Sequence, residues 1–259
     1  MTSTSAPDPG FDAPDLTCDG FLGGRLQVWQ PRAGYRAGID AVLLAAAVPA
    51  VAGQSVLDLG CGVGVASLCL GARVPGLALY GVEVQGGYAD LARRNAAENA
   101  ITFSVHTGDL AAMPAALRAR TFDHVIANPP YYRAPSRTAA RDKGRETAHT
   151  EATPLALWID SATRRLRHRG VLTVIQRADR LRDLLSACDA RLGTLKIWPL
   201  QARIGQPAQL ILLSAKKGGK APLEMRNPLI LHQGVRHERD TESYTESIRS
   251  VLRDGAPLN

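Results

Sequence analysis

Apolar and polar positions form two kinds of run along most of this chain. From residue 54 onward, short apolar runs typical of buried strands alternate with longer amphipathic runs typical of helices. The expected strands are 54–59, 78–83, 101–106, 122–127, 171–176, 194–199 and 208–214. The expected helices are 64–73, 86–99, 111–119, 154–168 and 178–191. Such alternation predicts a parallel sheet with helices on both faces.

The connection between the last two expected strands departs from this pattern. Residues 200–207 are few and include Gly205 and Pro207. Because a parallel crossover needs about a dozen residues, we expect these two strands to form an antiparallel hairpin. The predicted fold class is therefore α/β: a seven-stranded, mostly parallel sheet with one antiparallel edge strand.

The first fifty residues have a different organisation. Residues 1–17, with three prolines and three aspartates, are expected to form a disordered, solvated tail. Phe21 to Gln30 alternates loosely and suggests a hairpin, and Asp40 to Val48 suggests a helix that Asp40 caps. The expected organisation is one domain over 18–259, divided into a hairpin and helix (18–50), a core (51–215) and a C-terminal extension (216–259).

Composition narrows the class of partner. The 259 residues are 45% hydrophobic, which supports a sizeable core, and the formal net charge of +7 favours a polyanionic partner. The four cysteines lack C-x-x-C spacing, so we expect free thiols, a reducing compartment and no metal site. The longest apolar run, 41–52, is too short to span a bilayer, and no signal-peptide pattern precedes it. We expect a cytoplasmic monomer or weak dimer without a membrane partner.

The tetrapeptide Asn128-Pro129-Pro130-Tyr131 ends the apolar run 122–127. Two prolines cannot continue a strand ladder, so Asn128 is expected at the carboxyl end of a strand, where ligands bind in open α/β sheets. An Asn amide, a proline carbonyl and a tyrosine ring together suit a planar –NH2 group such as the exocyclic amine of adenine. An ordinary Asn-Pro turn after a strand is the alternative.

A glycine-rich turn lies about seventy residues upstream. Gly60, Gly62 and Gly64 separate a strand-like run ending near Asp58 from a helix-like run, an arrangement that lets a backbone approach a nucleotide closely. A carboxylate at Asp58 disfavours a pyrophosphate but favours a sulfonium ligand with an α-amino group. Glu83, at the end of the next strand, can accept hydrogen bonds from both ribose hydroxyls. The pattern predicts a nucleoside-type cofactor.

At this point the chain resembles a known family. The segment 56–64 with Glu83, Asp109 and residues 128–131 is similar to class I S-adenosylmethionine-dependent methyltransferases, whose Rossmann-like sheet has seven strands. Residues 35–44 and 141–150 also resemble the corresponding blocks of bacterial adenine N6-methyltransferases that modify the valine tRNA anticodon loop. The resemblance runs from about residue 20 to about residue 250.

The resemblance implies a cofactor, a substrate and a set of site residues. S-adenosyl-L-methionine would be the cofactor, and tRNA the substrate and partner. The cofactor-binding residues implied or expected are Arg36, Asp40, Asp58, Gly60, Gly62, Gly64, Glu83, Asp109 and Asn128. The catalytic residues would be Asn128, Pro129, Pro130 and Tyr131. For Asp109, capping of the expected helix 111–119 is an equal alternative.

A basic segment follows the tetrapeptide and is expected to bind RNA. Residues 131–153 form a long connection in which arginine and lysine outnumber acidic residues. Long connections in compact domains are usually functional or disordered. The expected RNA-binding residues are Arg133, Arg141, Lys143 and Arg145. Alternatively, residues 131–153 are only a solvated connection without a role in RNA binding. Two further basic stretches, 164–169 and 216–220, are alternative RNA-binding surfaces.

Three other functions stay open at this stage. A protein glutamine N5-methyltransferase usually has a helical N-terminal domain, and only about fifty residues precede the glycine-rich turn. A guanine N2-methyltransferase acting on rRNA uses the same type of tetrapeptide. A silent RNA-binding module on the same fold is the alternative outside the enzymes, and the intact tetrapeptide with Asp58 and Glu83 argues against it.

Overall fold

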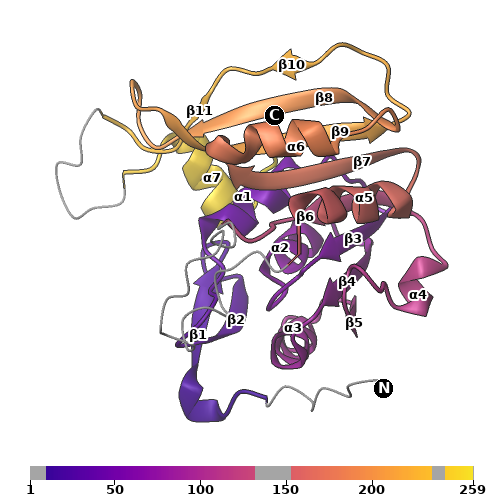
Figure 1. The fold of residues 1–259 in the computed structure, drawn as a ribbon. Helices are drawn as coiled ribbons and strands as arrows, with labels where there is room; N and C mark the ends of the chain where they lie inside the picture. Colours follow the sequence, from indigo (N-terminus) through magenta and orange to yellow (C-terminus); the bar gives the residue numbers. More distant parts are fainter. Residues whose placement is uncertain (1–9, 132–152, 235–242, 259) are drawn as a thin grey trace, which may run out of the picture.

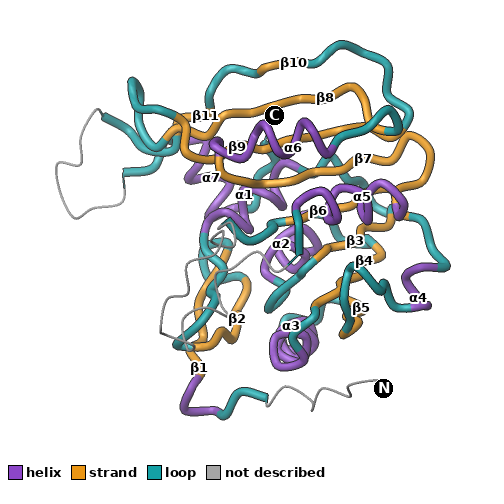
Figure 2. The backbone as a smooth tube through the Cα atoms, viewed as in Figure 1, coloured by secondary structure: helices purple, strands orange, loops and turns teal. Residues whose placement is uncertain are grey.

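The predicted alternation of strands and helices is confirmed along the chain (Figures 1 and 2). The computed structural model describes residues 10–131, 153–234 and 243–258. The strands are β1 (Leu16–Phe21), β2 (Leu26–Pro31), β3 (Ser55–Leu59), β4 (Ala78–Glu83), β5 (Phe103–Thr107), β6 (Phe122–Ala127), β7 (Leu166–Arg177), β8 (Leu192–Gln201), β9 (Ala208–Lys217), β10 (Glu224–Met225) and β11 (Leu229–Ile230). The α-helices are α1 (Ile39–Ala47), α2 (Val65–Arg73), α3 (Gly86–Glu98), α4 (Ala115–Arg118), α5 (Leu155–Arg165), α6 (Leu181–Ala187) and α7 (Glu246–Asp254).

The main sheet is mostly parallel, as predicted. Its order is β10-β8-β9-β7-β6-β3-β4-β5, with β11 also paired to β8, which makes nine strands among the described residues. Strands β3 to β7 pair in parallel, whereas β9 is antiparallel to both β7 and β8. The predicted hairpin of the last two long strands is therefore present.

The position of the antiparallel strand differs from the expected sheet edge. Strand β9 lies between β7 and β8, and the two-residue strands β10 and β11 extend the sheet beyond β8. The short 200–207 connection fixes only that β8 and β9 pair with each other. Burial explains which strand lies inside: β9 carries the buried run Ile211–Leu213 and buried Ala215, whereas β8 carries exposed Lys196.

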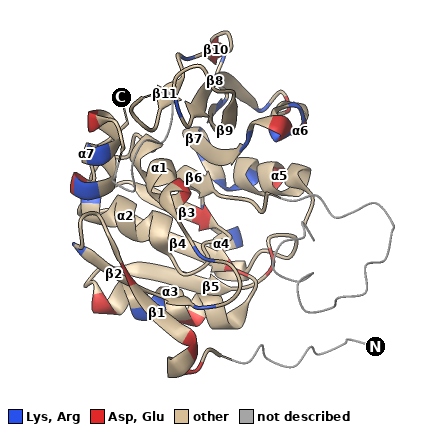
Figure 3. Cartoon of the chain, turned by 90° about the vertical axis from the view of Figure 1, so that its left-hand side faces the viewer, with Lys and Arg blue, Asp and Glu red and all other residues tan. Residues whose placement is uncertain are grey.

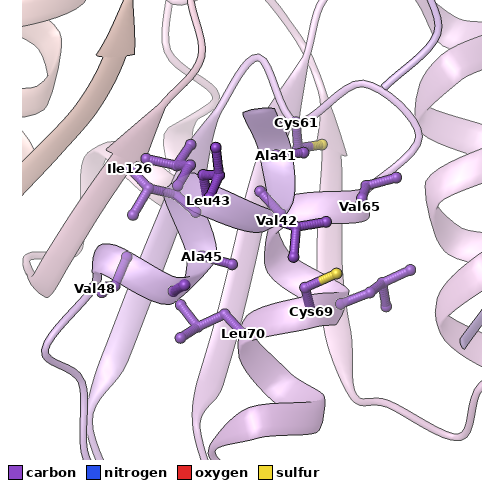
Figure 4. Packing of buried hydrophobic residues seen from close by; sticks show 14 of the residues in the cluster. Ala41, Val42, Leu43, Ala45, Val48, Cys61, Val65, Cys69, Leu70 and Ile126 are labelled. Carbon is purple, nitrogen blue, oxygen red and sulfur yellow. The ribbon is translucent and has the colours of Figure 1, made fainter. Parts of the chain in front are cut away.

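Alternate residues of the strands supply two cores, one on each face of the sheet. On one face, Val56 and Ile126 pack with helices α1, α2 and α3. Figure 4 shows this layer, in which residues of α1 lie beside Cys69 and Leu70 of α2 and beside Ile126. On the other face, Leu57 and Val125 pack with Trp158 and its neighbours on α5. This division follows the two-residue period of a strand.

The N-terminal region is more ordered than the sequence indicated. The hairpin β1–β2 spans Leu16 to Pro31, so it is longer than the expected 21–30. Residues 13–15 form a 3-10 turn, and the ring of Phe11 contacts that of Tyr88 edge-on with centroids 5.2 Å apart. Part of the expected 1–17 tail is thus structured, while residues 1–9 lie outside the described range.

Three expected helices are shorter than predicted. The expected helix 154–168 ends at Arg165 as α5, and residues 166–168 belong to β7. Helix α4 covers only Ala115–Arg118, since Pro114 stands at its N-cap and lacks the N–H needed to extend it backwards. Helix α6 ends at Ala187, and a 3-10 turn at Ala178–Arg180 precedes it. Within the described ranges, no helix is long and apolar enough to cross a membrane.

Candidate active site at the carboxyl edge of the sheet

The carboxyl ends of four parallel strands bring the predicted site residues to one edge. Leu59, next to Asp58, pairs with Ala127, next to Asn128. Glu83 pairs with Thr107, and the N–H of Gly108 donates to the Glu83 carbonyl over 2.8 Å, which places Asp109 beside this strand end. The register of β3, β4, β5 and β6 therefore gathers segments that are up to seventy residues apart in sequence.

The glycine-rich turn follows β3 in the conformation that glycine favours. Gly60, Gly62 and Gly64 have φ values of +62°, +53° and +90°. A β-carbon on Gly60 would lie only 2.4 Å from the Trp158 ring on α5, so side chains are excluded there by both conformation and space. The N–H of Gly62 donates to Glu83 Oε2 over 3.0 Å, which ties the turn to the end of β4.

Two carboxylates lie buried beside this turn. Asp58 is 3% exposed and accepts a 2.8 Å hydrogen bond from Ser67 on α2, and Glu83 is 7% exposed and also accepts from the N–H of Gln85. Burial raises the pKa of Asp58 to about 7 against the Ser67 hydrogen bond, and burial also raises the pKa of Glu83. Neither forms an ion pair with a cation in the described part of the chain. Since a buried charge is costly unless paired, the pair fits a ligand that carries positive charge and hydroxyl donors.

Side chains from three other segments hold the tetrapeptide. Asn128 Nδ2 donates to the Tyr35 hydroxyl over 3.4 Å, which directs the amide oxygen Oδ1 away from Tyr35. The Pro129 carbonyl accepts from Gln176 Nε2 of β7 over 3.3 Å. The Tyr131 hydroxyl donates to Asp40 Oδ2 of α1 over 2.5 Å. The amide and carbonyl oxygens are thus presented from a fixed backbone.

Helix α1 supplies Asp40, although not as the predicted cap. The N-cap of α1 is Gly38, without a side-chain hydrogen bond, and Asp40 lies inside the first turn. Its carboxylate accepts from Tyr131 instead, which ties the first turn of α1 to the tetrapeptide that follows β6. Burial, together with the charge of Asp40, raises the pKa of the Tyr131 phenol, which keeps the hydroxyl a donor.

Arg36 and Asp109, both expected to bind the cofactor, form hydrogen bonds within the protein. The Arg36 guanidinium donates to Thr17, the Pro31 carbonyl and Asp19, so it anchors the β1–β2 hairpin. Asp109 is exposed and accepts a 2.8 Å bond from the N–H of Ala111. This closes a local turn and does not cap α4, which begins four residues later.

The expected RNA-binding residues Arg133, Arg141, Lys143 and Arg145 lie outside the described residues. In the described ranges, no group of three His, Cys, Asp or Glu side chains could hold a metal ion.

Sequence reasoning missed two residues of the site, Tyr35 and Gln176. Tyr35 belongs to the 35–44 block that carried the family resemblance, so that block was the available signal. Its backbone is held in turn by Tyr88, whose hydroxyl accepts from the Tyr35 N–H over 3.0 Å. Gln176 is a fully buried polar residue at the end of an apolar strand run, a pattern that marks a side chain with specific partners.

Comparison with known proteins identifies similar methyltransferases. The model of the methyltransferase small domain family matches residues 36–190. The tRNA1(Val) (adenine(37)-N6)-methyltransferase of Dickeya chrysanthemi is 28% identical, over 93% of this chain and 95% of that protein. Its namesake from Porphyromonas gingivalis is 34% identical over 65% of this chain and 69% of that protein. The crystal structure of a predicted O-methyltransferase from Agrobacterium tumefaciens superposes with a TM-score of 0.67 at 28% identity, and covers 85% of this chain and 98% of that one.

Proposed function

The chain belongs to the methyltransferase small domain family, and we propose that it methylates the N6 amine of an adenine in tRNA. S-adenosyl-L-methionine is the cofactor, and it supplies a methyl group activated by a sulfonium centre. The relatives that act on adenine 37 of tRNA1(Val) give the substrate class. One observation supports the proposal most strongly. The tetrapeptide is held by hydrogen bonds at the carboxyl edge of the sheet, and the buried carboxylates of Asp58 and Glu83, which have no ion pair among the described residues, lie at the same edge.

The donor side of the site is made of Asp58, Glu83 and the glycine-rich turn. Asp58 would pair with the α-amino group of the cofactor, and Glu83 would accept hydrogen bonds from its ribose hydroxyls. The absence of side chains at Gly60, Gly62 and Gly64 lets the backbone lie close to the ligand. Asp109, next along the edge, is the candidate for the adenine ring of the cofactor.

The acceptor side is made of the tetrapeptide. The adenine amine is a poor nucleophile because its lone pair is delocalised into the ring. Asn128 Oδ1 and the free lone pair of the Pro129 carbonyl would accept its two N–H bonds, which favours the localised lone pair of the transition state. The ring of Tyr131 would stack on the base, once the base has been extruded from its stack at a few kcal/mol.

Asn128→Ala tests this assignment. We expect turnover to fall at least about a hundredfold, as for other preorganised donors and acceptors of a transition state, while cofactor affinity stays within about twofold of the parent. Turnover is measured on an unmodified tRNA transcript with labelled cofactor and nucleoside mass spectrometry, and affinity by calorimetry. Tyr35→Phe, which removes only the hydroxyl that orients the amide, is the matched variant and should lose less.

The outcomes separate the alternatives. Turnover of Asn128→Ala within about threefold of the parent, which is under about 1 kcal/mol of barrier, contradicts the assignment. If the parent methylates a protein glutamine or an rRNA guanine and no tRNA adenine, one of those enzyme functions replaces the proposed one. If the unmodified protein binds RNA but not the cofactor, it is a catalytically inactive RNA-binding module.

A further inference from the structure

Strand β7 carries a bulge made of basic residues. Along its pairing with β6, Phe122 faces Leu166 whereas His124 faces Val171, so the four residues 167–170 of β7 lie opposite the single residue Asp123 of β6. Arg167, His168 and Arg169 within this bulge are exposed. Arg169 has a φ of +65°, a left-handed conformation that is uncommon for a residue with a β-carbon. Bulges redirect side chains, and the three basic residues of this one are exposed.

The bulge forms one wall of a pocket of about 470 Å³. His168 and Arg169 line it from β7, Thr194 lines it from β8, and Lys216, Gly218, Gly219 and Lys220 line it from the end of β9. A second depression of about 450 Å³ shares Thr194 and Lys216 with it and continues toward Trp198. Figure 3 marks lysines and arginines in blue along the ribbon, for example on α7, which lies away from this pocket.

The charges of the first pocket are not neutralised. Arg169, Lys216 and Lys220 have no ion pair in the described part of the chain, and no acidic residue lines the pocket. Neighbouring cations behave differently: Arg167 pairs with Asp123, and Arg191 pairs with Asp160 and Asp189. The pocket therefore concentrates unpaired positive charge, which attracts phosphate groups.

Strand β6 connects this pocket to the candidate active site. It begins at Phe122, opposite Leu166 beside the bulge, and ends at Ala127, directly before Asn128. Six residues at ~3.3 Å each give a separation of about 20 Å. That is on the order of six nucleotide steps at the ~3.4 Å charge spacing of one duplex strand. A structured RNA with its target base at Asn128 is large enough to reach the pocket.

We propose that the pocket formed by Arg169, Lys216 and Lys220 binds the sugar–phosphate backbone of the RNA substrate, at the opposite edge of the sheet from the active site. The proposal rests on the proposed function, because the polyanion that would reach this pocket is the tRNA whose adenine is bound at the active site. Phosphate contacts at a distance position a substrate without reading its sequence. The pocket would thus orient the tRNA body while the tetrapeptide takes the base.

The test compares two triple variants of equal charge. The pocket variant is Arg169→Asn, Lys216→Gln and Lys220→Gln; Asn is chosen because it tolerates the left-handed backbone of residue 169. The control variant is Arg32→Gln, Arg182→Gln and Arg249→Gln, three exposed arginines that do not line the pocket. The dissociation constant for an unmodified tRNA transcript is measured by fluorescence anisotropy between about 0.05 and 0.5 M salt, and the cofactor affinity by calorimetry.

Each cation that neutralises a phosphate contributes about 0.7–0.9 to the slope of log K against log salt. We expect the pocket variant to lose about two to three units of slope, the double variant Lys216→Gln, Lys220→Gln to lose about 1.4–1.8, and the control to keep the parental slope. Cofactor affinity should be unchanged in all three, which also shows that they are folded.

Several results would overturn the proposal. One is a parental slope in the pocket variant; another is an equal loss of slope in the control, since binding would then follow net charge alone. A third is loss of binding to phosphatidylglycerol vesicles without loss of tRNA binding, which would make the pocket a membrane contact. In each of these cases a parent enzyme that still methylates tRNA leaves the proposed function intact. A parent that methylates no tRNA adenine removes the proposed function and this inference together.

Discussion

Asp58 is the residue whose protonation most directly links pH to ligand binding. Burial raises its pKa to about 7 from the ordinary 3.8, so in the folded protein without ligand it holds its proton well above the pH at which the unfolded chain loses it. The free energy of unfolding should therefore fall as pH rises from about 4 to 7. A cationic ligand needs the ionised form, so its binding releases this proton.

We expect cofactor affinity to rise with pH between about 5.5 and 7, by up to tenfold per pH unit below the pKa. Asp58→Asn should reduce this dependence and weaken binding at pH 7; Glu83, whose pKa burial raises in the same direction, would retain part of it. Calorimetry in two buffers of different ionisation enthalpy measures the released proton. A parent affinity that is flat over this range would show that Asp58 does not meet the ligand as a carboxylate.

Single residues of the site were easiest to predict where they stand at strand ends. Asp58 and Glu83 lie at the last residues of apolar runs and Asn128 directly follows one, so the pattern that predicts the strand also predicts their place at the edge. Tyr35 and Gln176 come to the tetrapeptide through tertiary packing, so the local patterns that mark these two residues do not specify the tetrapeptide as their partner. For Arg36, the family-like block 35–44 suggested a place in the cofactor site. Its side-chain hydrogen bonds instead go to the β1–β2 hairpin.

At the scale of elements, the turn between β3 and α2 is the least tolerant connection of the site. A β-carbon on Gly60 would meet Trp158 at 2.4 Å in a backbone with a φ of +62°. We expect Gly60→Ala to destabilise the fold by about 2–4 kcal/mol, from strain together with overpacking, and to weaken cofactor binding. Gly38→Ala is the control, since nothing lies within 4 Å of its added methyl group. Chemical denaturation measures both, and equal stabilities would contradict the described packing.

Most elements followed from the sequence, and the exceptions have physical causes. All seven expected strands are present because each is an apolar run bounded by turn residues. The expected helix 111–119 contains Pro114, which moves its start to Ala115. The order β7-β9-β8 was not predictable from a short connection, because a hairpin fixes which strands pair but not which of them meets the rest of the sheet.

The whole molecule carries a formal charge of +7, and two separate groups of cations could meet an RNA. One is the pocket beside β7; the other is the segment with Arg141, Lys143 and Arg145, which we propose from sequence alone to contact RNA near the active site. Replacing these three with Ala should flatten the salt dependence of tRNA binding by about two units without changing cofactor affinity.

If the two groups of cations contribute additively, combining this variant with the pocket variant should flatten the slope by about four to five units. A parental slope in the Arg141→Ala, Lys143→Ala, Arg145→Ala variant would make the segment a solvated connector. Anisotropy titrations over the same salt range serve for all these variants.

The place of β9 between β7 and β8 has a consequence for synthesis on the ribosome. Strand β8 ends at Gln201 and β9 at Lys217, and among the described strands β9 alone joins β8 to β7. At about 5–20 residues per second, the chain spends roughly one to three seconds between these points. During that time the edge of β7 that later pairs with β9 has no partner, although the strands of the active site have already been synthesised. The nascent chain is therefore most exposed to aggregation or chaperone binding just before its last long strand is complete.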